Sequence, residues 1–175
     1  QFFELRKLSN LNNKLDKENK QIMQIPSLQI GEHQAELPII QGGMGVGVSL
    51  HGLATAVANA GGIGVIAAAA IGFLKKDFQK KPHQANIDVL KEEILKAREL
   101  SPHGVIGVNI MVALTDYEDQ VRASFEANAD IIFSGAGLPL TMPKLKQEYP
   151  ESRTALVPII SSPRAAAILC KKWLR

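Results

Sequence analysis

The sequence lacks the features that mark disulfide-rich, membrane-spanning and nucleic-acid-binding proteins. One cysteine, Cys170, in 175 residues excludes an internal disulfide and indicates a reducing compartment, so we predict a cytoplasmic protein. No apolar run approaches the ~18 residues that a membrane helix needs. The net charge is only +3 and aromatic residues make up 5%, so the chain has no compact basic patch interleaved with aromatics. We therefore predict neither a membrane nor a nucleic-acid partner.

A dinucleotide-binding fingerprint is also missing, although glycines cluster in residues 37–66, LPIIQGGMGVGVSLHGLATAVANAGGIGVI. The fingerprint requires G-x-G-x-x-G, or alanine in the last position, between a strand and the following helix. After the first apolar strand, that last position falls on Val48 or Leu50. Residues 62–67 fit the string but precede a strand, so no helix N-terminus follows that could receive a pyrophosphate. The glycines need another explanation.

Short apolar runs alternate with longer amphipathic segments from Pro38 onward. Four of the five apolar runs are nearly continuous, as is typical of parallel strands that are buried on both faces. The predicted strands are Pro38–Gln41, Gly64–Ala68, Ile106–Met111, Asp130–Ser134 and Leu156–Ser161.

Helix start signals lie between these strands. Ser49 is expected to cap a helix over 50–60, Asn86 to cap one over 87–100, a capping box from Thr115 to Glu118 to open a third, and Ser162 with Pro163 to begin one over 164–174. A short helix is expected after Leu140, and a surface loop over 72–85. Residues 1–25 are polar and are expected to form an N-terminal extension.

Five consecutive βα units predict an α/β protein. A doubly wound open sheet and a (β/α)8 TIM barrel both fit this order. A barrel needs eight units and about 250 residues, and this chain stops inside an amphipathic helix without a stop signal. We therefore predict that residues 26–175 form the N-terminal part of a TIM barrel, with about its first five units.

The working face of a barrel lies at the carboxyl ends of its strands. Here those positions hold mostly small residues, such as Gly43 and Gly135, together with the amide of Asn109. No carboxylate pair, nucleophile–base pair or metal-ligand cluster occurs there, so no metal is predicted. Small residues leave room for a large, flat cofactor that brings its own reactivity. The alternative is that the glycines serve only tight turns and close packing.

Four motifs in order, PIIQGGMGVGVS, VANAGGIGVI, IGVNIMVAL and DIIFSGAGLP, resemble the nitronate monooxygenase family, also called 2-nitropropane dioxygenase-like flavoproteins. Flavin-dependent enoyl-acyl-carrier-protein reductase is a close relative by fold and cofactor. The resemblance covers about Pro26 to Arg175 and implies a TIM barrel that binds FMN at its C-terminal face. The cofactor-binding residues that it implies are Gly42, Gly43, Met44, Asn109, Gly135, Gly137 and Lys144, the last at a longer spacing than in the family.

The same resemblance implies that a nitronate or related carbanion is oxidised with O2 to a carbonyl compound and nitrite. The family's histidine lies in an Ala-Gly-Gly-His motif that this chain lacks. No catalytic residue is therefore expected before Arg175, and the chain by itself is expected to be inactive. Two alternatives stay open: a flavin-dependent enoyl-acyl-carrier-protein reductase using NAD(P)H, and a non-catalytic half-barrel. An open barrel would expose apolar surface, so a homo-oligomer is also considered.

The most reactive side chains have plainer predicted roles. Cys170 shares a helical face with Ala166 and Trp173, which predicts a buried structural thiol. The histidines lie away from the predicted strand ends and are expected to serve packing or the surface: His33, His51, His83 and His103.

Overall fold

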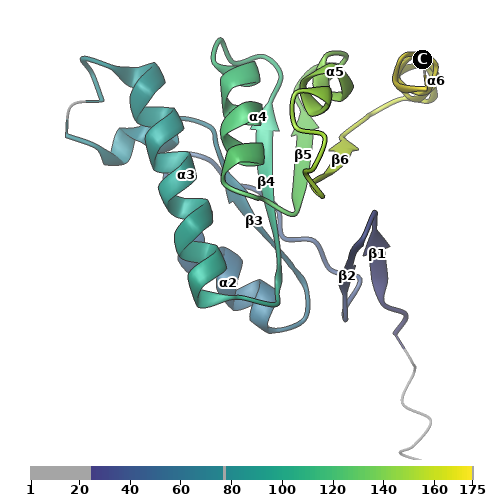
Figure 1. Ribbon diagram of the computed structural model, residues 1–175, viewed down its shortest axis with the longest axis horizontal. Helices are drawn as coiled ribbons and strands as arrows, with labels where there is room; N and C mark the ends of the chain where they lie inside the picture. The colour runs from purple at the N-terminus through teal and green to yellow at the C-terminus, as the bar shows by residue number, and fades with distance from the viewer. Residues whose placement is uncertain (1–24, 77, 175) are drawn as a thin grey trace, which may run out of the picture.

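A four-stranded parallel sheet forms the centre of the computed structural model, which describes residues 25–76 and 78–174. Figure 1 shows its strands, which are β3 (Ile63–Ala67), β4 (Val105–Met111), β5 (Ile131–Gly135) and β6 (Ala155–Pro158). They lie side by side in chain order. The predicted strands after the first are therefore confirmed, within a few residues at their ends. Residues 1–24 of the predicted N-terminal extension lie outside the described residues.

Helices cover one face of this sheet, which we call the outer face (Figure 1). They are α2 (His51–Asn59), the 3-10 turn η1 (Ile71–Leu74), α3 (Pro82–Leu100), α4 (Tyr117–Glu126), α5 (Met142–Gln147) and α6 (Pro163–Trp173). A doubly wound sheet would carry helices on both faces. Sequential parallel strands with helices on one face agree instead with the predicted barrel.

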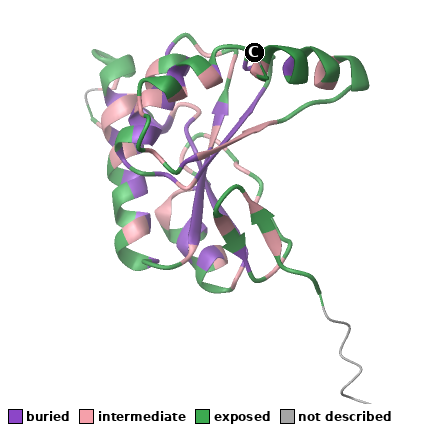
Figure 2. Cartoon of the chain, turned by 45° about the vertical axis from the view of Figure 1, so that its right-hand side comes forward, coloured by how far each residue is buried: buried purple, intermediate pink, exposed green. Residues whose placement is uncertain are grey.

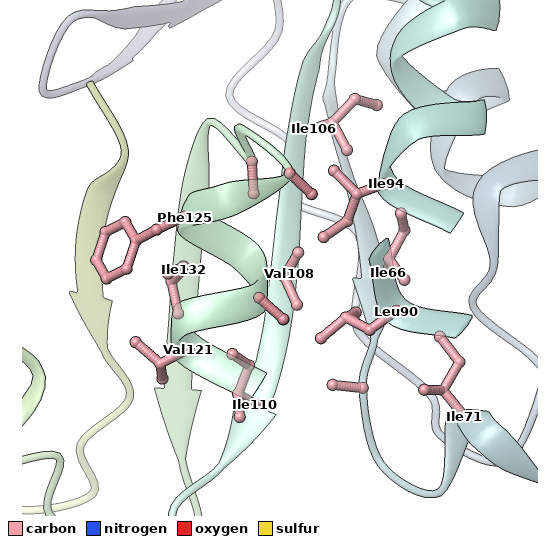
Figure 3. Close-up of a cluster of buried hydrophobic side chains, with 14 of the residues drawn as sticks. Ile66, Ile71, Leu90, Ile94, Ile106, Val108, Ile110, Val121, Phe125 and Ile132 are labelled. Atoms are coloured by element: carbon pink, nitrogen blue, oxygen red, sulfur yellow. The ribbon is translucent and has the colours of Figure 1, made fainter. Parts of the chain in front are cut away.

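The main core lies between the outer face and the helices. Figure 3 shows Ile66, Val108 and Ile132 of the strands meeting Leu90 of α3 and Val121 of α4. All five side chains are fully buried, and each contributes about 1.5–3 kcal/mol of hydrophobic stabilisation. Figure 2 shows the same arrangement, with buried residues concentrated in the strands and on the helix faces turned toward them. None of the described helices is both long and apolar enough to cross a bilayer.

A β-hairpin that the sequence analysis did not predict precedes the sheet. It consists of β1 (Leu28–Ile30) and β2 (His33–Ala35), which pair antiparallel. Gly31 occupies its turn at φ +59°, a conformation that glycine adopts without strain. The hairpin packs on the second face of the sheet, the inner face, against a separate buried cluster that includes Val105 and Ile131.

The first predicted strand, Pro38–Gln41, is reduced to a single parallel bridge between Ile40 and Ile63. The prediction of a full strand there is therefore wrong. Backbone hydrogen bonds join Ile63 to the residues on either side of Ile40, and then the backbone pairing stops. The Gln41 side chain bonds Val65, the next residue of β3 that faces it, through both atoms of its amide.

One predicted helix cap is confirmed and three are wrong. Ser162 accepts a hydrogen bond from the Ala165 N–H at 3.2 Å and begins α6. No side-chain bond caps α2, α3 or α4. Ser49 instead turns toward the glycine loop. Asn86 lies inside α3, because that helix already begins at Pro82, within the stretch predicted to be a surface loop. The proline at the first helical position was the missed start signal.

Cys170 is exposed, so its predicted burial is wrong. Leu169 is the buried residue of α6, and the adjacent position on the helix points Cys170 away from the core. Trp173 does pack against the core, and its indole N–H donates to the Pro139 carbonyl at 3.1 Å.

Candidate active site

The inner face carries alternate residues of each strand in regular layers. In one layer Ala67 pairs with Asn109, Asn109 with Phe133, and Phe133 with Val157. The neighbouring layer brings Gly107 beside them. A Cβ on Gly107 would lie 2.6 Å from the Phe133 ring, so the glycine makes room for that ring to lie across the sheet.

A pocket of about 350 Å³ opens on this face. Its volume falls in the range of about 300–1,000 Å³ that is usual for small-molecule sites. The lining contains no charged side chain and only two amides. It consists of Ile40, Gln41, Gly42, Gly43, Val65, Asn109, Phe133, Val157 and Ile159.

Gly43 lies directly against Asn109. A Cβ at position 43 would approach the Asn109 Cβ to 2.6 Å, so only glycine allows this contact. Asn109 is half-buried, and its amide makes no hydrogen bond to the part of the protein that the structure describes. The amide is therefore free to bind a ligand in the pocket. The structure thus places together Gly42, Gly43 and Asn109, which the resemblance had assigned to one cofactor site.

The glycine loop, residues 42–48, is held by the buried hydroxyl of Ser49. This oxygen accepts a hydrogen bond from the Met44 N–H at 3.0 Å and donates to the Gly42 carbonyl at 3.3 Å. The Ser49 N–H in turn donates to the Met44 carbonyl at 2.9 Å. The N–H groups of Gly42 and Gly43 donate to no group among the described residues. A fixed loop with free N–H groups can bind a polar ligand without rearranging.

Met44, Gly135 and Gly137 lie beside the pocket but do not line it. The Met44 side chain is 58% exposed. Gly135 ends β5, and a Cβ there would meet the pocket residue Ile159 at 3.1 Å. Gly137 follows at φ +146°, after Ala136 in a left-handed conformation. The three residues belong to the rim at the carboxyl ends of the strands.

Lys144 lies on the exposed side of α5 and is not part of the pocket lining. Its charge acts on Glu148 one helical turn away. A hydrogen bond from Arg122 is the main cause that lowers the pKa of Glu148, and Lys144 adds a smaller electrostatic contribution.

Three histidines make contacts that agree with structural roles. The His51 backbone N–H and ring Nδ1 both bond Glu93 Oε2, at 2.9 and 2.5 Å. His33 Nε2 lies 3.0 Å from the Arg153 carbonyl, and His83 lies 3.0 Å from Asp119. Burial raises the pKa of Glu93, but the bonds from His51 and from Lys96 outweigh it and leave that pKa below its ordinary value. No cluster of three potential metal ligands occurs in the described part of the chain.

A larger pocket, of about 540 Å³, lies at the opposite, amino-terminal end of the strands. It is polar, and two of its charged side chains, Arg98 and Asp130, bond to each other and to the backbone. Arg98 bonds Asp130 at 2.5 Å and the Gly104 carbonyl at 3.0 Å. Asp130 also accepts from the Ile106 N–H at 2.8 Å. These contacts join the ends of α3, β4 and β5, which is a structural task.

Some glycines do serve packing only. A Cβ on Gly64 would lie 1.9 Å from the Ala54 carbonyl oxygen, because α2 rests directly on β3. The plain explanation therefore holds for Gly64, and the ligand explanation concerns Gly42 and Gly43. Sequence reasoning missed Phe133 and Gln41, although a glutamine at the end of an apolar run is a signal of the kind that pointed to Asn109.

The sequential parallel strands, the helices on one face and the uncharged pocket at the carboxyl ends of the strands agree with part of a TIM barrel. A family model described as nitronate monooxygenase matches residues 27–174. The chain belongs to this family, whose members are flavin-dependent oxidoreductases. No curated protein matches.

Solved structures agree with this membership. FabK from Thermotoga maritima is 28% identical with a TM-score of 0.59, over 79% of this chain and 38% of that chain. A variant of the same FabK is 27% identical, with a TM-score of 0.60 and coverage of 79% and 40%. The nitroalkane oxidase from Streptomyces ansochromogenes is 19% identical, with a TM-score of 0.61 and coverage of 79% and 44%, and supports the fold alone. The chain therefore spans less than half the length of these proteins.

Proposed function

We propose that this chain forms one wall of the flavin site of an FMN-dependent oxidoreductase that oxidises nitronates or nitroalkanes with O2 to a carbonyl compound and nitrite. The free amide of Asn109, covered by the glycine loop in an uncharged pocket, is the observation that carries the proposal. An uncharged, partly apolar cleft with a few polar groups suits a flat aromatic ring system. Membership of the nitronate monooxygenase family supports the reaction class.

The proposed contacts involve the polar groups that have no hydrogen-bond partner among the described residues. The N–H groups of Gly42 and Gly43 and the amide of Asn109 would hydrogen-bond the polar edge of the ring. Phe133 and Val157 would meet its apolar part, and Met44, Gly135 and Gly137 would form the rim. Lys144, which the resemblance also implies, lies on the exposed side of α5, and no contact with the ring is proposed for it. A bound flavin would supply the two-electron chemistry that no side chain here provides.

No histidine or carboxylate lines the pocket among the described residues, so its lining offers no base for proton abstraction from a nitroalkane. We therefore propose that residues 1–175 bind the cofactor but do not turn over substrate. Steady turnover of ethyl nitronate by this chain would refute that part of the proposal.

An enoyl-acyl-carrier-protein reductase is the second candidate, supported by the likeness to FabK at 28% identity. The two activities use different electron acceptors and donors. In a protein that contains this chain within a complete barrel, O2 consumption with a nitronate supports the first. NADH consumption with an enoyl thioester supports the second.

A cytoplasmic location and a homo-oligomeric state remain predictions.

The sharpest test of the binding site uses two glycines with equal free space. A Cβ at Gly42 or at Gly52 would meet no atom within 4 Å, so neither Gly42→Ala nor Gly52→Ala disturbs the fold. Gly42 faces the pocket, whereas Gly52 lies in α2. We expect Gly42→Ala to weaken FMN binding about tenfold or more, equivalent to about 1.4 kcal/mol, and Gly52→Ala to leave it unchanged. Quenching of FMN fluorescence measures both. Equal affinity in the two variants, or no binding by the wild type, would contradict the site.

A further inference from the structure

The side chain of Gln41 occupies the place where a backbone ladder would continue. In a parallel pair, hydrogen bonds alternate evenly along the two strands. Ile63 donates to the Ile39 carbonyl at 2.9 Å, and Gln41 donates to the Ile63 carbonyl at 3.0 Å. The next two bonds would join Val65 to the backbone of residues 41 and 43.

Those two backbone bonds are absent, and the Gln41 amide makes both in their place. Its Oε1 accepts from the Val65 N–H at 3.2 Å, and its Nε2 donates to the Val65 carbonyl at 3.0 Å. Val65 is 1% exposed, so without this amide both of its backbone groups would be buried and unpaired. A primary amide has the same donor and acceptor pair as a peptide group, which is why glutamine fits here.

Because the Gln41 amide makes these two bonds, the main chain after residue 41 does not have to continue along the sheet. Gly42 and Gly43 can then leave the strand and lie over Asn109, in the contact that permits no Cβ at position 43. The second hydrogen of Gln41 Nε2 points to Ser49 Oγ at 3.2 Å, and this hydroxyl is the one that holds Met44 and Gly42. One side chain thus joins the interior of β3 to the glycine loop.

We propose that Gln41 is the positioning residue of the glycine loop: by replacing two ladder bonds it sets the loop over Asn109 and fixes the spacing of the pocket between them. The significance of that spacing for flavin rests on the proposed function. The positioning itself does not, because it is a property of the protein without ligand.

Amide hydrogen exchange on the full chain without flavin tests this directly. In Gln41→Met, which keeps the length and removes the amide, we expect the N–H groups of Val65, Met44 and Ser49 to exchange at least about tenfold faster than in the wild type. In Ser49→Ala, the Met44 N–H should exchange faster while the Val65 N–H stays protected. Gln147→Met, an exposed glutamine on α5, is the matched control and should change nothing.

The pattern separates positioning from general destabilisation. If Gln41→Met speeds the exchange of the Ile132 N–H in β5 as much as that of Met44, or leaves Met44 and Ser49 at wild-type rates, the proposal is overturned. Absence of FMN binding would defeat the proposed function and leave this result unaffected.

Gln41→Glu provides a second test, the pH dependence of loop protection, which a merely structural role for Gln41 would not change. The ionised carboxylate can accept from the Val65 N–H but cannot donate to the Val65 carbonyl or to Ser49. Protonation restores a donor. Relative to the wild type at each pH, loop protection should therefore be low at neutral pH and recover as pH falls below the carboxyl pKa. This variant carries the test if Gln41→Met does not fold. A loss of loop protection relative to the wild type that is the same at neutral pH and below the carboxyl pKa would overturn the proposal.

Discussion

Replacing Gly64 by alanine is expected to be among the most destabilising single changes in this chain. The added Cβ would lie 1.9 Å from the Ala54 carbonyl oxygen and 2.5 Å from its carbon. Both atoms are backbone of α2, so no rotamer change can relieve the overlap. The helix itself must move away from β3.

The size of that movement determines how much stability the protein is expected to lose. Restoring an ordinary contact of 3.4 Å from 1.9 Å requires a shift of about 1.5 Å along the α2–β3 interface. Ala54 and Ala58 of α2 are buried in this interface, and their contacts with the sheet would open together. Overpacking typically costs about 1–3 kcal/mol, and a shift of a whole helix belongs at or above the upper end. We expect a loss of about 3 kcal/mol or more.

Urea denaturation followed by circular dichroism measures this loss, and thermal melting should show a decrease in Tm of about 6–12 °C. Gly52→Ala, in the same helix but with no atom near its Cβ, is the control and should be neutral or stabilising by up to about 1 kcal/mol. A loss below about 1 kcal/mol for Gly64→Ala would refute the reasoning, because it would mean that α2 does not rest on the backbone of β3.

Two further predictions concern buried polar contacts. Because the pKa of Glu93 is lowered below 4.5 in the folded state, its stabilising contribution is present above pH 4.5 and is lost as pH falls through the lowered value. Glu93→Gln should therefore lower the free energy of unfolding at pH 7 and lower it less at pH 3. A loss that is the same at both pH values would contradict this. Asn86 accepts from the Gly72 N–H at 2.9 Å and donates to the buried Asp116 at 2.7 Å. Asn86→Ala should therefore cost about 1–3 kcal/mol in urea denaturation, whereas Gln84→Ala on the exposed side of α3 should cost little.

Hydrophobic pattern was sufficient to predict the sheet. The strands β3 to β6 are short apolar runs between amphipathic segments, and burial on both faces explains why β3 and β5 are almost entirely apolar. The hairpin escaped prediction because each of its strands has only three residues, too few to show a period. Its apolar residues Leu28, Ile30 and Ala35 are explained only by their packing on the inner face of the sheet, which the local sequence does not show.

Only some residues of the candidate pocket could be named from the sequence, and the contacts that hold it together could not. Glycines at a strand end and an asparagine in an apolar strand were visible in the sequence, and Gly43 does lie against Asn109. Ser49 was expected to cap a helix because serine often does so. Its hydroxyl instead meets Gln41, Gly42 and Met44, and such a choice between local and tertiary partners depends on contacts that the sequence pattern does not contain.

The hairpin has a consequence for the order of events during synthesis. His33 contacts the carbonyl of Arg153, 120 residues later in the chain, and Gly31 lies against Ala155 of β6. A segment near the start of the chain therefore cannot reach its final contacts until the last described strand has left the ribosome. The βα units can form from neighbouring residues one after another, whereas docking of the hairpin must wait for β6. The hairpin is thus synthesised before β3 to β6 but makes these contacts only after β6 is in place.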